Sequence, residues 1–547
     1  MKLSLCMIVK DEEKNLPQCL KHIKDVVDEI IVVDTGSKDN TPYIAQQLGA
    51  KVYHFKWCDD FSAARNESLR HAKGDYIIYL DADDRVSKKD AEKIATLKNS
   101  FPEEKNVAYS LKIVFSTPEN SKNCAYQVRI FPNLPDIRFE QPIHEQIVPS
   151  LKRKGIKGVL TDIVIEHKGY EDYELLRKKA YRNLNILKNL LLKDPDSWFV
   201  HYFLAQTYDV LGEKELYKFH LQKVLTEECK REDQNWFIGA ALKYSYLLIE
   251  DGNIAEARKF LEELENEFSD NNLVRFFLAE LNLKEGDYVT ALNYYVTIDT
   301  NRLTLITIPT PEDKLKFRYY LNMGQCNEKL EYYNMALNSY EKAYSIAYND
   351  ELKKEALMKI VSLLVKLDKL KDAVSYIKEY AELDATAMSY TLLALAYMRN
   401  GLYKKAENCL KKAISIDPTY YNSKIKLAEL LIKDGRLTEA KVLIKPLIDK
   451  QDISATEKAA VLLMSAFIYI SEFCLEEFLI ITDLLLKQIG IKAEVKNFIE
   501  LYDLYNKLSA YFNSSYSPYI KGIKNCLMLI KDFSAQQDRQ LCAYDAL

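Results

Sequence analysis

A pattern of turn glycines and small alanines, repeated from residue 217 onward, constrains the fold of this chain more than any other feature. A glycine followed by an alanine in the next helical run occurs as Gly252/Ala257, Gly286/Ala291, Gly401/Ala406 and Gly435/Ala440. With looser copies, the anchors of the pattern are Tyr217, Ala257, Ala291, Ala336, Ala373, Ala406 and Ala440. Successive anchors lie 33 to 45 residues apart, close to the period of about 34 residues that is typical of two-helix units that stack on one another. The pattern therefore predicts an all-helical solenoid.

The segment Tyr390–Pro418 shows how one unit would be built. Ala394 and Ala406 are small enough for two helices to approach closely, Gly401 fits the turn between them, and Pro418 ends the second helix. The segment resembles one tetratricopeptide (TPR) repeat. The resemblance implies a right-handed array with a concave surface suited to hold a protein or peptide.

The period of the apolar residues divides the chain into four segments. Over residues 1–172, short β-rich runs alternate with amphipathic helical runs, which predicts an α/β domain with a largely parallel central sheet. We predict a connecting helix over 173–196, TPR repeats over 197–450, and a helical cap or dimerisation region over 451–547. The strands are expected at 3–9, 29–34, 51–55, 76–80, 107–115, 125–131 and 159–167, and the helices at 12–26, 41–48 and 61–71.

Composition narrows the class of partner and the compartment. A formal net charge of -4 gives no reason to expect a nucleic-acid partner, since binding to phosphates would favour a basic surface. The ten cysteines are scattered without a CxxC pair, as is typical of buried thiols in a reducing compartment. The most apolar late stretch, residues 462–486, is interrupted by acidic side chains and does not read as a membrane span. We therefore expect a cytoplasmic protein with neither a nucleic-acid nor a membrane partner.

A run of carboxylates follows the expected strand at residues 76–80. Asp81, Asp83 and Asp84 would lie at the carboxyl end of that strand, where α/β sheets place their ligands. Asp81 and Asp83 offer hard oxygen ligands that suit Mg²⁺ or Mn²⁺, and such an ion would neutralise a diphosphate leaving group. Acidic residues also end strands simply as helix caps, so the surrounding motifs decide between the two interpretations.

Four motifs follow one another in a fixed order in the first domain. The opening strand precedes the turn at residues 31–41, the pair Arg65 and Asn66, and finally Asp81 and Asp83. In this order and spacing the first domain closely resembles family 2 glycosyltransferases of the GT-A fold. The resemblance implies an enzyme that uses a divalent metal ion, Mn²⁺ or Mg²⁺, and a nucleotide-sugar donor, with a UDP-sugar as the expected donor.

The resemblance assigns roles to individual residues. The nucleotide-sugar site would be formed by Val9, Asp11, Glu12, Asp34, Arg65, Asn66, Asp81 and Ala82. The metal ligands would be Asp81, Asp83 and His167, the last in a His-x-Gly-Tyr arrangement that looks like the third ligand of several GT-A enzymes. Three plainer roles stay open: Asp34 as the cap of a helix that begins near Asn40, Arg65 as a surface partner of Glu12 or Asp60, and His167 as a contact of the first repeat helix.

A His-Glu pair offers the general base. His144 and Glu145 follow the run Arg129-Ile130-Phe131 and resemble a motif of glycosyltransferases that carry TPR repeats. Inverting transfer needs a carboxylate that deprotonates the acceptor, and Glu145 is the local candidate, with His144 orienting or polarising. A structural Glu145, paired with Arg129 or Arg138, is the alternative.

The two halves together imply a function. The arrangement resembles bacterial flagellin O-glycosyltransferases and also the S-glycosyltransferases that modify cysteines of bacteriocin precursors. We expect metal-dependent, inverting transfer of a sugar, GlcNAc or Glc, from a UDP-sugar to a Ser or Thr of a protein acceptor such as flagellin, held by the TPR groove. The alternatives are transfer to a cysteine of a bacteriocin peptide, and a non-catalytic TPR scaffold with a vestigial transferase domain. The C-terminal helices also offer a surface for a homodimer.

Overall fold

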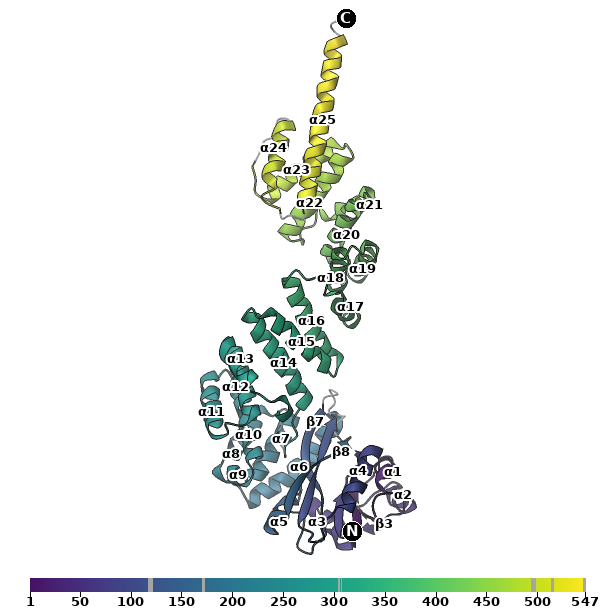
Figure 1. The fold of residues 1–547 in the computed structure, drawn as a ribbon, viewed down its shortest axis with the longest axis vertical. Coiled ribbons are helices and arrows are strands. Elements are labelled where there is room, and N and C mark those ends of the chain that lie inside the picture. Colours follow the sequence, from purple (N-terminus) through teal and green to yellow (C-terminus); the bar gives the residue numbers. More distant parts are fainter. Residues whose placement is uncertain are drawn as a thin grey trace. The chain divides into compact units, whose positions relative to one another are not determined.

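The structure is a computed structural model, and it describes residues 1–116, 122–169, 173–303, 305, 307–492, 498–512 and 516–544. The chain forms two compact units, Met1–Ala356 and Leu357–Leu547. The first unit contains the β-sheet and the first part of the helical region, and the described part of the second unit is helical (Figure 1). The fold class, an α/β domain followed by an all-helical repeat region, is confirmed. The domain boundaries at residues 172, 196 and 450 remain predictions.

Eight strands within the described residues form one sheet in the order β3-β2-β1-β4-β7-β6-β8-β5. They are β1 (Leu3–Val9), β2 (Glu29–Asp34), β3 (Lys51–His54), β4 (Tyr76–Tyr79), β5 (Asp84–Val86), β6 (Val107–Ser116), β7 (Lys122–Pro132) and β8 (Lys157–His167). β3, β2, β1 and β4 pair in parallel, as expected.

The other half of the sheet is mixed, and there the expectation of a largely parallel sheet is wrong. β7 runs antiparallel to β4 and to β6, and β5 runs antiparallel to β8, whereas β6 and β8 are parallel. Residues 117–121 alone separate β6 from β7. That is too short for the crossover connection that a parallel pair requires, so the two strands pair in opposite directions.

Helices cover both faces of the sheet (Figure 1). They are α1 (Leu16–Ile23), α2 (Thr41–Gln47), α3 (Phe61–His71), α4 (Lys88–Asn99) and α5 (Val148–Arg153). Successive side chains of β1 point to opposite faces. Leu5 packs in one core with Leu20 of α1 and Ile94 of α4. Cys6 packs in a second core, which contains Leu69 of α3. Burial on both faces explains why β1 is apolar along its whole length.

After residue 172, every regular element of the described chain is a helix. In the first unit these are α6 (Tyr173–Lys193), α7 (Trp198–Leu211), α8 (Lys214–Val224), α9 (Glu227–Glu232), α10 (Gln234–Glu250), α11 (Ile254–Glu267), α12 (Asn272–Glu285), α13 (Tyr288–Val296), the 3-10 helix η1 (Thr300–Arg302), α14 (Glu312–Lys329) and α15 (Tyr333–Ile346). α16 (Asp350–Lys366) enters the second unit, which continues with α17 (Val374–Leu383), α18 (Ala387–Arg399), α19 (Tyr403–Ile416), α20 (Tyr421–Lys433), α21 (Leu437–Ile444), the 3-10 helix η2 (Lys445–Leu447), α22 (Ala455–Ser471), α23 (Leu475–Gln488), α24 (Phe498–Leu508) and α25 (Ser517–Tyr544). None of the described helices combines the length and the apolar run that a membrane crossing needs.

The predicted repeat anchors lie where paired helices meet. Ala257 and Ala291 are completely buried. Gly286 ends α12 in the left-handed conformation, with φ of 85°, which lets the helix stop and the chain turn. At Gly324 of α14, an added Cβ would lie 2.5 Å from the ring of Tyr340 in α15, so this helix pair packs closely because it has glycine there. The helical-repeat prediction is confirmed.

The second unit has a buried core of its own, to which α18 to α25 contribute. Ala406 and Ala440, two of the predicted repeat anchors, lie completely buried in it. The helices after residue 451 pack on the same core. Their role as a cap or as a dimerisation region remains a prediction.

In the first unit, a shared core and a backbone bridge join the sheet domain to the helices. The core includes Ile143 of the sheet domain and extends through α6 and α7 to α14. β4 pairs with the carboxyl end of β7, and near the other end Cys124 N donates to Thr310 O at 2.9 Å while Thr310 N donates to Cys124 O at 3.0 Å. Lys112 of β6 pairs with Glu312 of α14 at 3.0 Å. The sheet domain and the first repeat helices therefore form one continuous body.

Candidate active site

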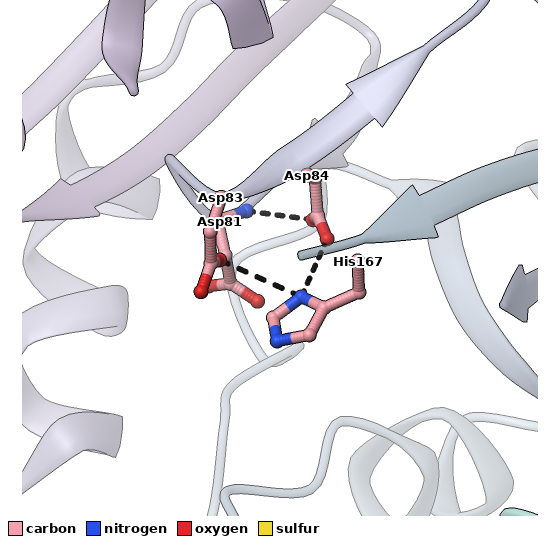
Figure 2. Close-up of side chains that lie close together, drawn as sticks. All are labelled: Asp81, Asp83, Asp84 and His167. Atoms are coloured by element: carbon pink, nitrogen blue, oxygen red, sulfur yellow. Dashed lines mark hydrogen bonds and ion pairs between the residues drawn. The ribbon is translucent and has the colours of Figure 1, made fainter. Parts of the chain in front are cut away.

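Carboxylates from one turn and an imidazole from a distant strand meet beyond the end of β4 (Figure 2). Asp81 and Asp83 follow β4, and Asp84 begins β5. β5 pairs with β8 so that Asp84 lies opposite His167, the last residue of β8. One ligand atom from each of these four residues lies within 4.8 Å of the others. The structure thus brings together the three predicted metal ligands and adds Asp84 to them.

Asp84 is the member of this cluster to which the sequence prediction gave no role. Its carboxylate is completely buried, accepts the backbone N–H of Asp81 at 2.8 Å and lies 2.9 Å from Nδ1 of His167. When Nδ1 donates to Asp84, Nε2 of His167 keeps the lone pair that a metal ion requires. The sequence did carry a signal, namely a third acid directly after the predicted pair.

The charges of the cluster favour a bound cation. Burial raises the pKa of Asp83, and the carboxylates of Asp81 and Asp84 add to this effect against the opposing influence of His167. Burial alone would lower the pKa of His167, but its hydrogen bond to Asp84 and the neighbouring carboxylates raise the pKa above its usual value. The neighbouring carboxylates raise the pKa of both side chains, which is the effect of negative charge concentrated at one place. Carboxylate oxygens with one imidazole nitrogen are a donor set that fits Mn²⁺ or Mg²⁺.

Arg65 connects this cluster to Glu145. Its Nη2 donates to Oδ1 of Asp81 at 2.6 Å, and its Nε donates to Oε1 of Glu145 at 2.5 Å. Arg65 is buried, and its guanidinium carbon lies 4.8 Å from the centre of the Tyr79 ring. The alternative of a surface arginine paired with Glu12 or Asp60 is therefore wrong. Glu145 does form an ion pair, but its partner is Arg65 and not Arg129 or Arg138.

A second arginine approaches the same carboxylates from β7. Nη1 of Arg129 lies 3.5 Å from Oδ2 of Asp81 and 3.4 Å from Oδ2 of Asp84. Burial alone would raise the pKa of Asp81, but Arg65, Arg129 and His167 together hold this pKa well below its usual range. Asp81 therefore stays ionised at neutral pH. In the sequence, Arg129 is part of a family motif and an alternative partner of Glu145, and its position beside Asp81 emerges only from the fold.

The connecting helix α6 also contributes a charge to the site. Nζ of Lys179 donates to the carbonyl oxygen of Gly169 at 3.1 Å. A Cβ added to Gly169 would collide with Oδ2 of Asp83 and would lie 2.8 Å from Nε2 of His167 and 3.0 Å from Nζ of Lys179. Three polar atoms therefore converge where Gly169 has no side chain. Lys179 was not predicted, because nothing in a helical run marks one lysine among several.

The ends of β1 and β2 lie beside each other at the same edge of the sheet, with Val9 opposite Asp34. Asp34 is buried and accepts the backbone N–H of Ser37 at 3.1 Å, so it shapes the turn after β2. The alternative role of Asp34 as the cap of the helix that begins near Asn40 is wrong, since its carboxylate is used within this turn. Asp11 N donates to the Ser37 hydroxyl at 2.9 Å, which ties the end of β1 to the same turn.

Three other predicted donor-site residues have their own environments. Glu12 N donates to the Thr41 hydroxyl at 2.7 Å, and burial raises the pKa of the Glu12 carboxyl. Ala82 is buried between the two ligand aspartates. Both ends of the Asn66 amide bond the backbone of Phe139, at 2.9 and 2.8 Å. In this structure Asn66 therefore holds the segment before Glu145, rather than lying among the carboxylates.

His144 faces the repeat helices. Its ring stacks on the ring of Phe203 in α7, with centroids 3.7 Å apart and planes 6° apart. Burial, helped by the positive charge of Arg182, lowers the pKa of His144 to about 3, so the ring is neutral at physiological pH. The adjacent Glu145 turns to Arg65 instead. Two neighbouring residues thus contact two different domains.

Comparisons with known proteins agree with this arrangement. The family described as "Glycosyl transferase family 2" matches residues 4–110, and tetratricopeptide repeats match residues 317–350 and 387–420. An uncharacterized glycosyltransferase of Rickettsia typhi is 30% identical over 233 residues, which cover 39% of this chain and 79% of that protein. The SPbeta prophage-derived glycosyltransferase SunS of Bacillus subtilis is 26% identical over 64% of this chain and 81% of its own length. A TPR repeat-containing protein of Synechococcus elongatus is 44% identical over 27% of this chain, and the match spans 36% of that protein.

Proposed function

This chain belongs to glycosyltransferase family 2, and we propose that it is a metal-dependent inverting enzyme that transfers a sugar from a UDP-sugar to a protein side chain. The observation that carries the proposal is the cluster of Asp81, Asp83, Asp84 and His167. It lies beyond β4, which pairs with β1, and β1 and β2 end beside each other at Val9 and Asp34. In open α/β sheets this edge is the usual place for a nucleotide and its phosphates.

The proposed donor site divides into a nucleoside part and a diphosphate part. The ends of β1 and β2, with Asp11, Glu12 and Asp34, would hold the nucleoside. Asp81, Asp83 and His167 would hold Mn²⁺ or Mg²⁺, which when bound neutralises the diphosphate. Lys179 would add a positive charge on the side of Asp83. GlcNAc and Glc are the sugars that we propose.

The acceptor would be activated by Glu145. Its carboxylate takes the proton of the acceptor while the acceptor atom forms a bond to the anomeric carbon. The bond between that carbon and the diphosphate oxygen breaks, and UDP leaves with the electron pair, so the configuration inverts. Arg65, which contacts both Glu145 and Asp81, would keep the base and the leaving-group site in a fixed relation.

For the acceptor we prefer a Ser or Thr of a protein such as flagellin, because a TPR array offers a long surface for a protein or peptide. One contact favours a cysteine as the second candidate. Oε1 of Glu145 is already engaged by Nε of Arg65 at 2.5 Å, so this oxygen is not available to take the proton of the acceptor. A thiol, with a pKa of about 8.5, needs less help to lose its proton than an alcohol does.

A vestigial, non-catalytic transferase domain is the less favoured function. Asp84 and Arg129 are almost completely buried beside Asp81. Burying charged groups costs desolvation free energy even when they are paired, and such groups are often retained for function. Their presence together therefore supports a working site.

The test is mass spectrometry of acceptors after incubation of the full chain with Mn²⁺ and a panel of UDP-sugars. Flagellin and peptides that contain Ser, Thr or Cys serve as candidate acceptors. We expect the mass of one sugar on a single acceptor residue, no product from Asp83→Ala, and normal product from Asp162→Ala, a matched change at a well-exposed acid of β8. Equal product from Asp83→Ala, or none from the natural chain with any donor, would contradict the proposal.

A further inference from the structure

The short loop that carries Glu145 is held on one side by the transferase domain. Phe61 N, at the start of α3, donates to the carbonyl oxygen of Pro142 at 2.7 Å. Four residues later in the same helix, Arg65 binds the Glu145 carboxylate. α3 therefore holds both ends of the loop segment from residue 142 to residue 145.

The same loop is held on its other side by the repeat helices. Ile143 is buried in the core that contains α6 and α7. The His144 ring stacks face to face on Phe203, which is itself only 7% exposed. Neighbouring residues of the loop thus contact different domains: Ile143 and His144 contact the helices, and Glu145 contacts the transferase domain.

The backbone at His144 adopts a conformation that depends on the residues around it. Its φ of 53° lies in the left-handed region. For a residue other than glycine that conformation is unfavourable and is kept only where the surroundings impose it. The stack on Phe203 is the contact that holds the His144 side chain, and the direction of the next side chain, Glu145, depends on the same backbone turn.

We infer that the repeat region is part of the active site: Phe203 of α7, through the stacked ring of His144, positions the Glu145 carboxylate against the acceptor. The inference rests on the proposed function of Glu145 as the base. Phe203 and His144 are positioning residues, and what His144 contributes is an aromatic ring rather than a proton. The repeat helices would therefore both bind the acceptor and fix the position of Glu145, the base that acts on it.

Substitutions at His144 and Phe203 distinguish a requirement for a stacked aromatic ring from a requirement for an imidazole group. Phe203→Ala and His144→Ala remove the contact, whereas Phe203→Tyr and His144→Phe keep two stacked rings. Phe237→Ala is the matched control, because Phe237 is 8% exposed in the same helical core and belongs to α10, where its ring contacts Phe268. We expect the two alanine variants to lose at least about tenfold in kcat. We also expect unchanged UDP affinity in calorimetry with Mn²⁺, and recovery of most of the activity in the variants that keep a ring.

Amide hydrogen exchange of residues 143–147 gives a readout that does not depend on activity. We expect faster exchange there in Phe203→Ala and His144→Ala, and exchange at the natural rate in Phe237→Ala. If His144→Phe is as inactive as His144→Ala, or if the alanine variants leave kcat and loop exchange unchanged, the inference is wrong. A natural chain that transfers no sugar would instead overturn the proposed function, and loop exchange would then decide alone whether α7 positions Glu145.

Discussion

Positively charged side chains surround the carboxylates of Asp81 and Asp83, and they could contact a diphosphate bound there. Arg65 and Arg129 approach Asp81 from α3 and β7, and Lys179 lies near Asp83 from α6. Arg65 Nη1 is buried and forms no hydrogen bond within the described residues. A buried donor of this kind is costly unless a ligand uses it. The residues that keep Asp81 ionised are therefore also candidates to contact the donor.

The first prediction concerns Lys179. Lys179→Ala should weaken UDP binding about tenfold or more, because a hydrogen bond to a charged group contributes about 1.5–3 kcal/mol. Isothermal titration calorimetry with UDP and Mn²⁺ measures the effect. Lys178→Ala is the control, since Lys178 is exposed on the same helix and pairs with Glu174 at 3.1 Å. Equal affinity in the two variants would show that Lys179 lies outside the donor site.

The second prediction concerns the residue that sequence reasoning missed. Asp84→Asn should lower Mn²⁺ affinity by about 10–100-fold, because Asp84 orients His167 through the bond at Nδ1. Electron paramagnetic resonance of free Mn²⁺ in titrations gives this affinity directly. Glu166→Gln, a change at the exposed neighbour of His167, should leave Mn²⁺ binding as it is. If both variants bind Mn²⁺ as the natural chain does, Asp84 has no part in holding the metal.

Between α7 and α8, two buried histidines form a pair that responds to pH. Nδ1 of His201 lies 2.7 Å from Nδ1 of His220, and Nε2 of His201 lies 3.0 Å from the carbonyl oxygen of Pro195. Burial lowers the pKa of both side chains, and for His220 it falls to about 4, with His201 contributing. The folded chain therefore prefers the pair neutral.

This pair predicts a loss of stability in mild acid. The unfolded histidines bind protons near pH 6.5, whereas the folded ones bind them at lower pH, so protons favour the unfolded chain below pH 6.5. Stability should fall from pH 6.5 towards pH 4 by up to about 1.4 kcal/mol per pH unit for each histidine. Thermal unfolding measured across this range tests the prediction. His220→Phe keeps a ring beside Tyr208 and should reduce the slope; an unchanged slope would assign the acid sensitivity to other groups.

The elements that sequence reasoning predicted well are those whose apolar pattern is long enough to recognise. α3 has the predicted bounds, and the helical region follows its repeated anchors. β5 has three residues and no periodicity to detect, and Asp84 lies on it. The pairing of Arg65 with Glu145 and the approach of Lys179 join residues far apart in sequence. Such contacts follow from how elements pack, which a single sequence does not encode in any local pattern.

The whole chain contains a unit larger than the transferase domain alone. The unit Met1–Ala356 includes the sheet and the helices through α15. The core around Ile143, the stack of His144 on Phe203 and the pair of Lys112 with Glu312 all cross residue 172. A transferase domain cut at residue 172 would expose these surfaces to water.

The fourth prediction follows from this larger unit. A fragment of residues 1–349, which ends between α15 and α16, should unfold in one cooperative transition and bind UDP as the full chain does. A fragment of residues 1–172 should aggregate or melt without a clear transition, because it exposes apolar surface of the shared core. Calorimetry and circular dichroism of both fragments provide the measurement. A shorter fragment that melts sharply and binds UDP normally would show that the transferase domain folds without the repeats.

The backbone bridge between Cys124 and Thr310 has a consequence for how the chain is made. One edge of β7 pairs with β4 over only a few residues, and farther along the same strand Thr310 forms a backbone bridge to Cys124. An uncovered strand side offers its N–H and C=O groups to any other extended chain. During synthesis Cys124 leaves the ribosome long before Thr310. Until Thr310 is made, this edge of β7 would be unpaired in every nascent chain on the same messenger RNA. Once Thr310 pairs with β7, this edge is closed. The helical region would therefore protect the chain from pairing with another copy before it binds a protein acceptor.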